Sequence, residues 1–531
     1  MQWFTLVSAA AVLLFILYLI RRRRRLSKEP PLDKGLIPWL GHALDFGRDS
    51  AKFLLKMKTK YGDIFTVRVA GRFVTFLFDP HSFDSVVSES SAKLDFTKFS
   101  LALMDRIFNL QLPNYDHHEE KILMKMQFQG KNLSSLTQAM LSNLKTLLMT
   151  DENGRTNTWK KEGLFNFCYD TMFRAGYLTL YGNEAAESWE QTSKIKDKVN
   201  SSEVYNVYRR LDQLLMKIVR STLSADEKIQ AASVKEHLWQ LLSVEKLSTR
   251  VNRSSWIQTY CSHLQRQGLH KDMQARAMVL QLWATQGNVG PTAFWLLIFL
   301  LKHPEAKKAV QEEIKKIYFN QIMFTANQEV LNNTPVFDSI LNETLRLTAA
   351  PFITRDILQN MSLQLADGRE YHLRMGDRLC LFPYLSPQMD PEIYEEHEKF
   401  KYDRFLNQDG TKKTTFFKDG KQLKHYILPW GAGTNVCIGK HFAINSLKLY
   451  KFQTLTHPDM DLDWYSLKMM SCSVINSRLN SLSQHSAEFS SLLEQCNTYV
   501  CDSMRIFSKN HLALSHCTIH QIDNWPFKSS I

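Results

Sequence analysis

Cysteine is scarce in this chain: eight cysteines occur among 531 residues, and they form neither a close pair nor a CxxC motif. This pattern excludes a disulfide framework and favours a reducing compartment. The sequence also lacks internal repeats and, before residue 448, low-complexity linkers. These absences exclude a repeat architecture.

Acidic residues are outnumbered, with 53 Asp and Glu against 66 Lys and Arg, which gives a net charge of +13. Arg21 to Arg25 supply five of these charges, which leaves +8 for the rest of the chain. A charge this modest does not indicate a nucleic-acid surface, so no nucleic-acid partner is expected. Apolar residues at 44% and aromatic residues at 11% predict a globular fold.

The first 20 residues are almost wholly apolar and are followed directly by the five arginines. About 20 such residues can cross a bilayer as one helix. A cleaved signal peptide is the alternative, but such signals carry positive charge before the apolar stretch. We therefore expect a retained transmembrane anchor over 1–20, with the arginines and the body of the protein on the cytosolic side. Residues 21–45 are basic and proline-rich and predict a stiff connector.

The body, residues 46–448, combines many helical segments with a few short strands, which predicts a mainly α fold with a small β region. Phe65–Val69 and Phe73–Phe78 flank Gly71 and predict a hairpin. Further segments have helical spacing: 133–149, 204–222, 232–250 and 336–348. Residues 273–301 predict a long apolar helix, interrupted at Gly287, Gly290 and Pro291. A second membrane span is the alternative, but polar residues within this segment favour a buried central helix.

Cys437 lies in a glycine-rich loop, Trp430–Gly439, that leads into a helical pattern. Glycines let backbone N–H groups approach the sulfur, and a helix N-terminus favours a thiolate. A lone thiolate in such a loop suits the axial position of a haem iron. A buried structural cysteine is the alternative.

Glu343 and Arg346 form an ExxR motif, and the i, i+3 spacing places both side chains on one face of a helix. The apolar residues around them indicate that this pair is buried, and a buried ion pair needs further partners. Arg404, flanked by aromatic residues, is a plausible third member. An ExxR motif, an aromatic-flanked arginine and a glycine-rich cysteine loop, in this order and spacing, form a specific signal.

These three motifs resemble the signatures of the cytochrome P-450 superfamily. The resemblance implies the cytochrome P-450 fold, with haem b (iron protoporphyrin IX) between the central helix and the cysteine helix. It implies that the Cys437 thiolate binds the haem iron. It also implies that Glu343, Arg346 and Arg404 form a structural network.

Further stretches resemble one branch of this superfamily, the branch that converts prostaglandin H2 to prostaglandin I2. They are residues 29–33, 37–47, 281–288, 347–355 and 428–433, the last with Trp430 in place of the usual phenylalanine. This resemblance implies an isomerase that acts on a lipid endoperoxide and needs neither NADPH, dioxygen nor a reductase. It implies location in the endoplasmic reticulum membrane.

Monooxygenases of the superfamily usually carry an acid and a threonine in the central helix to protonate dioxygen. The corresponding positions here hold Gly287 and Asn288, and an amide is a poor proton relay. This loss favours an endoperoxide isomerase, in which we expect Asn288 to take part in catalysis and substrate binding. Related sterol hydroxylases resemble this pattern, so a sterol or fatty-acid monooxygenase stays open.

The resemblance also implies further site residues. Arg355 is expected in a strand near the haem edge as a propionate partner, and Gly431, Gly433 and Asn435 belong to the cofactor-binding loop. Arg106 and Arg378 are candidates for haem or substrate contacts, with solvated surface arginines as the alternative. A last group is expected to line the substrate pocket, unless its members are plain core: Leu112, Trp283, Phe352 and Thr354.

The resemblance ends near residue 448. From there to residue 531 the sequence is a divergent tail, rich in Ser, Asn, Gln, His and Cys, with no clear period. The superfamily continues its cysteine helix with an apolar run at this point. A third hypothesis is therefore a catalytically inactive, membrane-anchored protein without stable haem.

Overall fold

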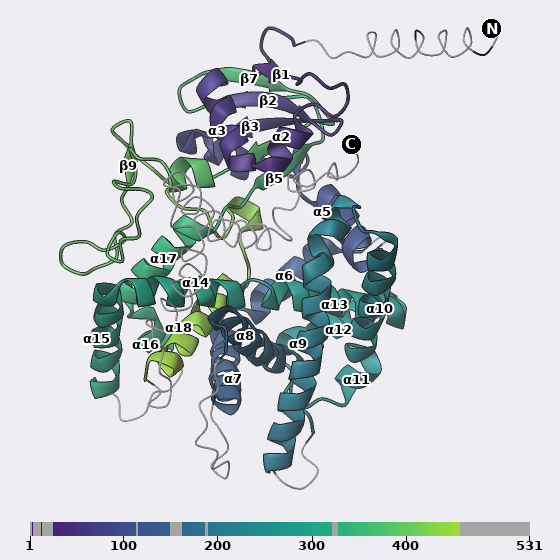
Figure 1. Cartoon of the computed structure of the whole chain (residues 1–531), viewed down its shortest axis with the longest axis vertical. Coiled ribbons are helices and arrows are strands. Elements are labelled where there is room, and N and C mark those ends of the chain that lie inside the picture. The colour runs from purple at the N-terminus through teal and green to yellow at the C-terminus, as the bar shows by residue number, and fades with distance from the viewer. Residues whose placement is uncertain are drawn as a thin grey trace, which may run out of the picture.

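The computed structural model describes residues 25–112, 115–148, 162–185, 190–320 and 328–456, together with Trp3 and Val12. Helices dominate these residues, and the expected mainly α fold with a small β region is confirmed (Figure 1). The helices are α2 Ala43–Arg48, α3 Ser50–Tyr61, α4 Asp84–Val87, α5 Thr97–Phe108, α6 His117–Gln127, α7 Gly130–Leu148, α8 Leu164–Tyr181, α9 Glu190–Arg220, α10 Ala225–Leu241, α11 Val244–Ser248, α12 Ser255–Arg266, α13 Lys271–Gln286, α14 Val289–Lys302, α15 Pro304–Asn320, α16 Gln328–Asn332, α17 Pro335–Thr348 and α18 Lys440–Thr456.

One six-stranded sheet, in the order β1-β2-β3-β8-β5-β4, joins early and late parts of the chain. The strands are β1 Leu32–Asp33, β2 Ile64–Val69, β3 Arg72–Leu77, β4 Leu94–Asp95, β5 Ile353–Ile357, β6 Met361–Gln364, β7 Glu370–Leu373, β8 Arg378–Leu381, β9 Phe417–Lys418 and β10 Lys421–Gln422. The predicted hairpin around Gly71 is confirmed, because β2 pairs antiparallel with β3. Figure 1 shows this sheet with α2 and α3 at one end of the molecule.

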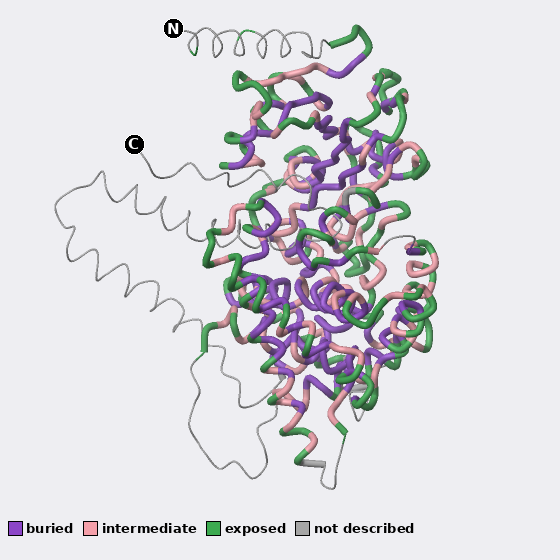
Figure 2. Tube along the Cα trace, turned by 90° about the vertical axis from the view of Figure 1, so that its right-hand side faces the viewer, coloured by how far each residue is buried: buried purple, intermediate pink, exposed green. Residues whose placement is uncertain are grey.

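The two faces of the sheet pack against different partners. One face lies against α2 and α3 through a cluster that contains Phe46 and Phe352. The other face packs against the segment that carries the cysteine, through Leu428 and Ala432. The largest cluster lies among the helices, where Figure 2 shows the buried parts of the trace. The sheet therefore supports the cysteine loop from one side.

The central helix is buried and broken, as predicted. α13 ends at Gln286 and α14 begins at Val289, so the break falls at Gly287 and Asn288. A Cβ atom at Gly287 would lie 2.8 Å from the Tyr208 hydroxyl and 2.9 Å from the Trp283 carbonyl oxygen, so a side chain here would be crowded. Within the described ranges, no helix is both long and apolar enough to cross a membrane.

Two predicted helices have the wrong bounds. The expected segment 232–250 is two helices in the structure, α10 and α11, and α10 begins seven residues earlier, at Ala225. A capping box between Ser224 and Glu227 fixes this start, because each residue satisfies a backbone N–H of the other. Helix α9 likewise begins 14 residues before the predicted segment 204–222, at Glu190, whereas the segments 133–149 and 336–348 agree closely with α7 and α17.

The helix after the cysteine crosses the boundary that the sequence indicated at residue 448. α18 runs to Thr456, and the side chains of Leu449, Tyr450 and Phe452 are fully buried in the main core. The first part of the divergent segment thus packs as helix. The rest of the tail lies outside the described residues, as does the predicted anchor apart from Trp3 and Val12.

Lys451 is an unfavourable residue within this buried stretch, and it generates a first prediction. Its side chain is fully buried, and its amine has no hydrogen-bond partner in the described part of the chain. We expect Lys451→Met to stabilise the protein by about 1–3 kcal/mol, because methionine has a similar length and no polar group to desolvate. The measurement is the thermal unfolding midpoint, with the exposed Lys302→Met as control.

The difference in stability between Lys451→Met and the natural chain should also depend on pH, which gives a second test of this prediction. Burial holds the pKa of Lys451 well below its ordinary value of 10.5. Between the folded-state pKa and 10.5 the unfolded chain therefore binds more protons than the folded chain, and stability rises with pH. The stability gap between Lys451→Met and the natural chain should narrow as the pH rises toward 10.5. A gap that stays constant or widens would contradict the burial of an unpartnered amine.

Candidate haem-thiolate site

The cysteine loop is held close to the N-terminal half of the chain. The Cys437 backbone N–H donates to the Trp430 carbonyl oxygen at 2.8 Å. Gly433 has a φ of +63°, and a Cβ atom there would lie 2.1 Å from the Val87 carbonyl oxygen at the end of α4. Only glycine allows both this conformation and this approach.

Backbone N–H groups converge on the Cys437 sulfur. Those of Gly439 and Lys440 lie beside it and favour its charged form, and Lys440 begins α18. Burial raises the pKa of the Cys437 thiol, and these N–H groups act in the opposite direction. Cys437 is an exposed residue of this loop. This geometry suits a thiolate whose negative charge a metal ion stabilises.

Two cationic side chains, those of Arg355 and Lys121, lie beside the loop, and Lys125 is one helical turn from Lys121. Arg355, on β5, is 5% exposed, and its one hydrogen bond in the described residues goes to the Thr354 carbonyl oxygen at 2.8 Å. Lys121, on α6, donates to the Thr434 carbonyl oxygen and to Asn435 Oδ1, the latter at 3.3 Å. Burial and the nearby charges of Arg355 and Lys125 lower the pKa of Lys121.

No carboxylate forms an ion pair with any of these three cations among the described residues. Asp95 influences Arg355 from a longer distance. A desolvated guanidinium and two ammonium groups that repel each other form a site for anions, and arginine in particular suits carboxylates.

Helix α6 leaves apolar surface uncovered on this side of the molecule. None of its residues is buried, and Ile122 and Met126 are 49% and 60% exposed. Val436, next to the cysteine, is 45% exposed. Haem b is a flat apolar ring with two propionate carboxylates and an iron that accepts a thiolate. The apolar surface, the three cations and Cys437 therefore fit this cofactor.

The ExxR pair is completely buried and forms a network with Arg404, whose side chain is 7% exposed. Arg346 donates to both carboxylate oxygens of Glu343, at 2.7 and 2.8 Å, and neither side chain is exposed. Arg404 Nε donates to Glu343 Oε1 at 2.9 Å. Arg346 also donates to the carbonyl oxygens of Gln388 and His397, at 2.8 and 2.6 Å. The network ties α17 to the segment that leads toward the cysteine loop.

Asn288 stands at the break of the central helix. Its carbonyl oxygen accepts from Thr292, but its half-buried side chain makes no hydrogen bond with any described residue. The Gly287 carbonyl oxygen accepts from the Tyr169 hydroxyl at 3.3 Å, which fixes the backbone of the break. The carboxamide of Asn288 is thus available to a ligand.

Three other predicted residues lie among the helices near α5. Arg106 is exposed and donates to the Val219 carbonyl oxygen at 2.8 Å. Leu112 is partly buried against the main core. Trp283 is buried, and its ring centroid lies 5.5 Å from that of Phe108. Their contact with substrate stays a prediction.

The structure does not bring the remaining three candidates to the cysteine loop. Phe352 stacks on Phe382 with ring centroids 4.2 Å apart. Thr354 lies against Cys380, and Arg378 Nε donates to Asp356 Oδ1 at 2.6 Å. Since side chains alternate along a strand, Thr354 points away from the face that carries Arg355. These residues belong to the sheet and its α2–α3 face, and a pocket role for them stays a prediction.

Lys121 is the site residue that the sequence analysis missed. The signal was present, because Lys121 and Lys125 are four residues apart and share one face of α6 with its apolar residues nearby. Nothing in the sequence placed that face beside Arg355.

The buried network generates a prediction for stability. Glu343→Gln removes the one carboxylate that pairs with Arg346 and Arg404. We expect a loss of about 3–5 kcal/mol, because two guanidinium groups are then left without their counter-charge. Chemical unfolding compared with the exposed Glu370→Gln checks this. Equal stability of the two variants would contradict a structural role for Glu343.

Comparisons with known proteins agree with this geometry. The sequence model of the family "Cytochrome P450" matches residues 30–464. Prostacyclin synthase of Rattus norvegicus is 55% identical over 468 residues, 87% of this chain and 93% of the relative. A 5-beta-cholestane-3-alpha,7-alpha-diol 12-alpha-hydroxylase of Sus scrofa is 40% identical over 446 residues, 82% of this chain and 87% of the relative.

The solved structure of a cyanobacterial CYP120A1 with retinoic acid bound resembles the fold. Its TM-score is 0.61 at 18% identity, and the match covers 82% of this chain and 95% of the other. The family match covers most of the chain, and it includes the ExxR network, Arg404 and the Cys437 loop. A haem with a cysteine thiolate ligand follows from it. The chain belongs to the cytochrome P450 family.

Proposed function

We propose that this chain is a haem-thiolate isomerase that converts prostaglandin H2 to prostacyclin without NADPH or dioxygen. The observation that carries this proposal is its 55% identity to a prostacyclin synthase across almost the whole relative. Its identity to the sterol hydroxylase is 40%, which disfavours the monooxygenase alternative.

Four side chains would hold the cofactor. Cys437 would bind the iron, and Arg355, Lys121 and Lys125 would neutralise the two propionates. Asn435 supports this arrangement by accepting a hydrogen bond from Lys121 at 3.3 Å. The superfamily often has an arginine or histidine at the Asn435 position, and Lys121 would supply the missing cation from α6. When bound, the haem supplies an iron centre that can cleave the weak O–O bond of an endoperoxide without added electrons.

The break in the central helix suits this reaction. Gly287 offers no side chain, and Asn288 offers an amide that neither donates nor accepts a proton readily. The site therefore has no acid at this point to protonate dioxygen. The free carboxamide of Asn288 would instead donate a hydrogen bond to an oxygen of the substrate and so orient it. Leu112 and Trp283 are the apolar candidates for enclosing its chain.

We place the protein in the endoplasmic reticulum membrane, with its catalytic body in the cytosol. The apolar residues 1–20 would form a single-pass anchor, and the five following arginines favour a cytosolic position for everything after them. A lipid endoperoxide partitions into such a membrane, so the anchor would keep the enzyme near its substrate.

The function is tested with the purified full-length chain and prostaglandin H2 alone. We expect prostacyclin to form without NADPH or a reductase, as followed by chromatography and NMR. Cys437→Ser should abolish turnover together with the ferrous carbon monoxide absorption typical of thiolate-ligated haem. A strict NADPH requirement would support the monooxygenase instead. A natural chain that never shows the thiolate absorption would support the inactive form.

Lys121 gives a separate prediction about haem retention. Lys121→Met keeps the length of the side chain and removes the charge that would face a propionate. We expect the haem to dissociate about tenfold faster, since hydrogen bonds to charged groups are worth about 1.5–3 kcal/mol. Transfer of haem to apomyoglobin measures this rate. The exposed Lys131→Met is the control, and an unchanged rate in Lys121→Met would remove this residue from the propionate site.

A further inference from the structure

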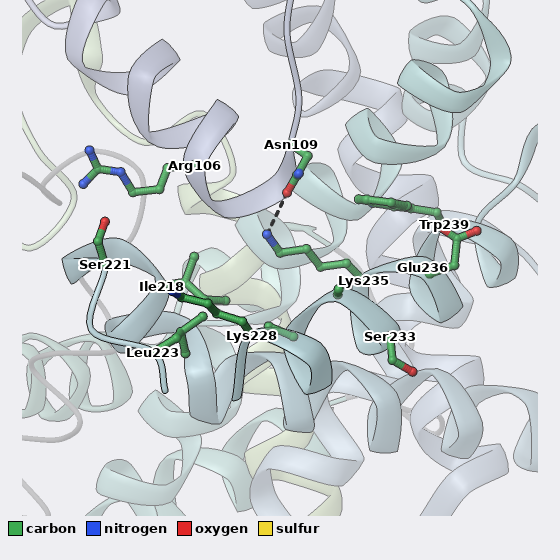
Figure 3. A pocket seen from close by; sticks show the side chains of 12 residues that line it. Arg106, Asn109, Ile218, Ser221, Leu223, Lys228, Ser233, Lys235, Glu236 and Trp239 are labelled. Carbon is green, nitrogen blue, oxygen red and sulfur yellow. Dashed lines mark hydrogen bonds between the residues drawn. The ribbon is translucent and has the colours of Figure 1, made fainter. Parts of the chain in front are cut away.

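A cavity of about 660 Å³ lies between the C-terminal end of α5, the end of α9 and helix α10. This volume is in the range of ordinary small-molecule sites. None of its lining residues belongs to the cysteine loop, to β5 or to the break of the central helix. Figure 3 shows Lys235 and Asn109 in its middle, with Arg106 and Ser221 to one side and Trp239 and Glu236 to the other.

Lys235 is the central polar group of this cavity. Its side chain is 8% exposed, and its amine donates to Asn109 Oδ1 at 2.8 Å. An ammonium group has three donors, and among the described residues this one forms no ion pair. Burial, followed by the charge of Arg276, lowers the pKa of Lys235 to about 8. A buried amine in this state is stabilised by an added anion.

Cations outnumber acids around the amine. Arg106 and Lys228 line the cavity, and the Arg276 guanidinium lies 4.4 Å from the Trp239 ring. The acids are Glu236, which is exposed, and Asp105, which acts on Lys235 from nearby. The cavity therefore presents a positive charge and, on Lys235, an amine with unused hydrogen-bond donors.

The lining also has apolar side chains: Ile218 and Leu223 lie on one side of Lys235, and the Trp239 ring lies on the other (Figure 3). A small hydrophilic anion would use only the donors and leave this surface wet. A ligand with a carboxylate and a hydrocarbon chain would use both. We propose that this cavity binds a long-chain fatty acid, with its carboxylate on Lys235 and its chain along Ile218 and Leu223. This site shares Arg106 with the predicted haem or substrate contacts, contains no residue of the cysteine loop, and does not depend on the proposed isomerase activity.

The test uses the haem-loaded full-length chain in nanodiscs of uncharged phosphatidylcholine. An azole ligand occupies the haem iron, and empty nanodiscs correct for partition of the probe. We expect equilibrium dialysis with radiolabelled palmitate to show one bound equivalent. Lys235→Met should weaken this binding at least tenfold, because it removes the charged donor and keeps the side-chain length. The exposed Lys246→Met, outside the cavity, should bind palmitate like the natural chain.

Two competition measurements distinguish the contribution of the palmitate carboxylate from that of its hydrocarbon chain. Hexadecanol, which lacks the carboxylate, should compete at least tenfold more weakly than unlabelled palmitate. Inorganic phosphate, which lacks the chain, should not displace palmitate at equal concentration. Leu223→Trp, which fills the cavity and keeps every cation, should also abolish the binding.

The proposal is overturned if Lys235→Met and Leu223→Trp both bind palmitate like the natural chain, or if phosphate displaces it equally well. If Lys235→Met loses its thiolate-haem absorption and so its fold, Leu223→Trp alone decides the outcome. Conversion of prostaglandin H2 is measured separately, so a failure here leaves the proposed function untouched, and the reverse also holds.

Discussion

The buried carboxylate of Glu343 is the contact on which the rest of the site depends. It accepts hydrogen bonds from Arg346 and Arg404, and neither Glu343 nor Arg346 is exposed. Because desolvated charges are costly unless each is satisfied, the backbone around them has little freedom. The carbonyl oxygens of Gln388 and His397 complete the coordination of Arg346. These hydrogen bonds fix the path of the chain between α17 and the cysteine loop. They thereby also fix the direction from which the sulfur would approach the haem.

The two ends of the haem region favour charges of opposite sign. At the sulfur, backbone N–H groups of Gly439 and Lys440 favour negative charge. At the edge near β5, Arg355, Lys121 and Lys125 offer positive charge without a described ion-pair partner. A cofactor with a cationic metal at its centre and carboxylates at its rim satisfies both ends. This complementarity argues for haem from the protein side alone, independently of the family match.

Sequence reasoning succeeded where local chemistry decides the structure and failed where distant packing does. The hairpin around Gly71, the break at Gly287 and the buried helix of Glu343 follow from local patterns, and all are present. The face of the sheet that each residue of β5 uses depends on strand register and on what covers each side. Successive residues of a strand point to opposite faces of the sheet, but the sequence did not show which of these two faces lies toward the cysteine loop. The sequence could therefore not show that Arg355 lies on the loop side and Thr354 on the other. Lys121 was missed for a similar reason, since its partners lie more than 200 residues away.

The close approach of Gly433 to Val87 also has a consequence for biosynthesis. It joins the loop that carries the ligand, near the end of the described chain, to a helix formed by residues 84–87. β3 pairs with β8 across a similar separation. Contacts of such long range form late, because the ribosome must release nearly the whole domain before they can close. We therefore expect haem to bind only after the domain has been synthesised, and a stalled nascent chain that ends before Cys437 would lack the iron ligand.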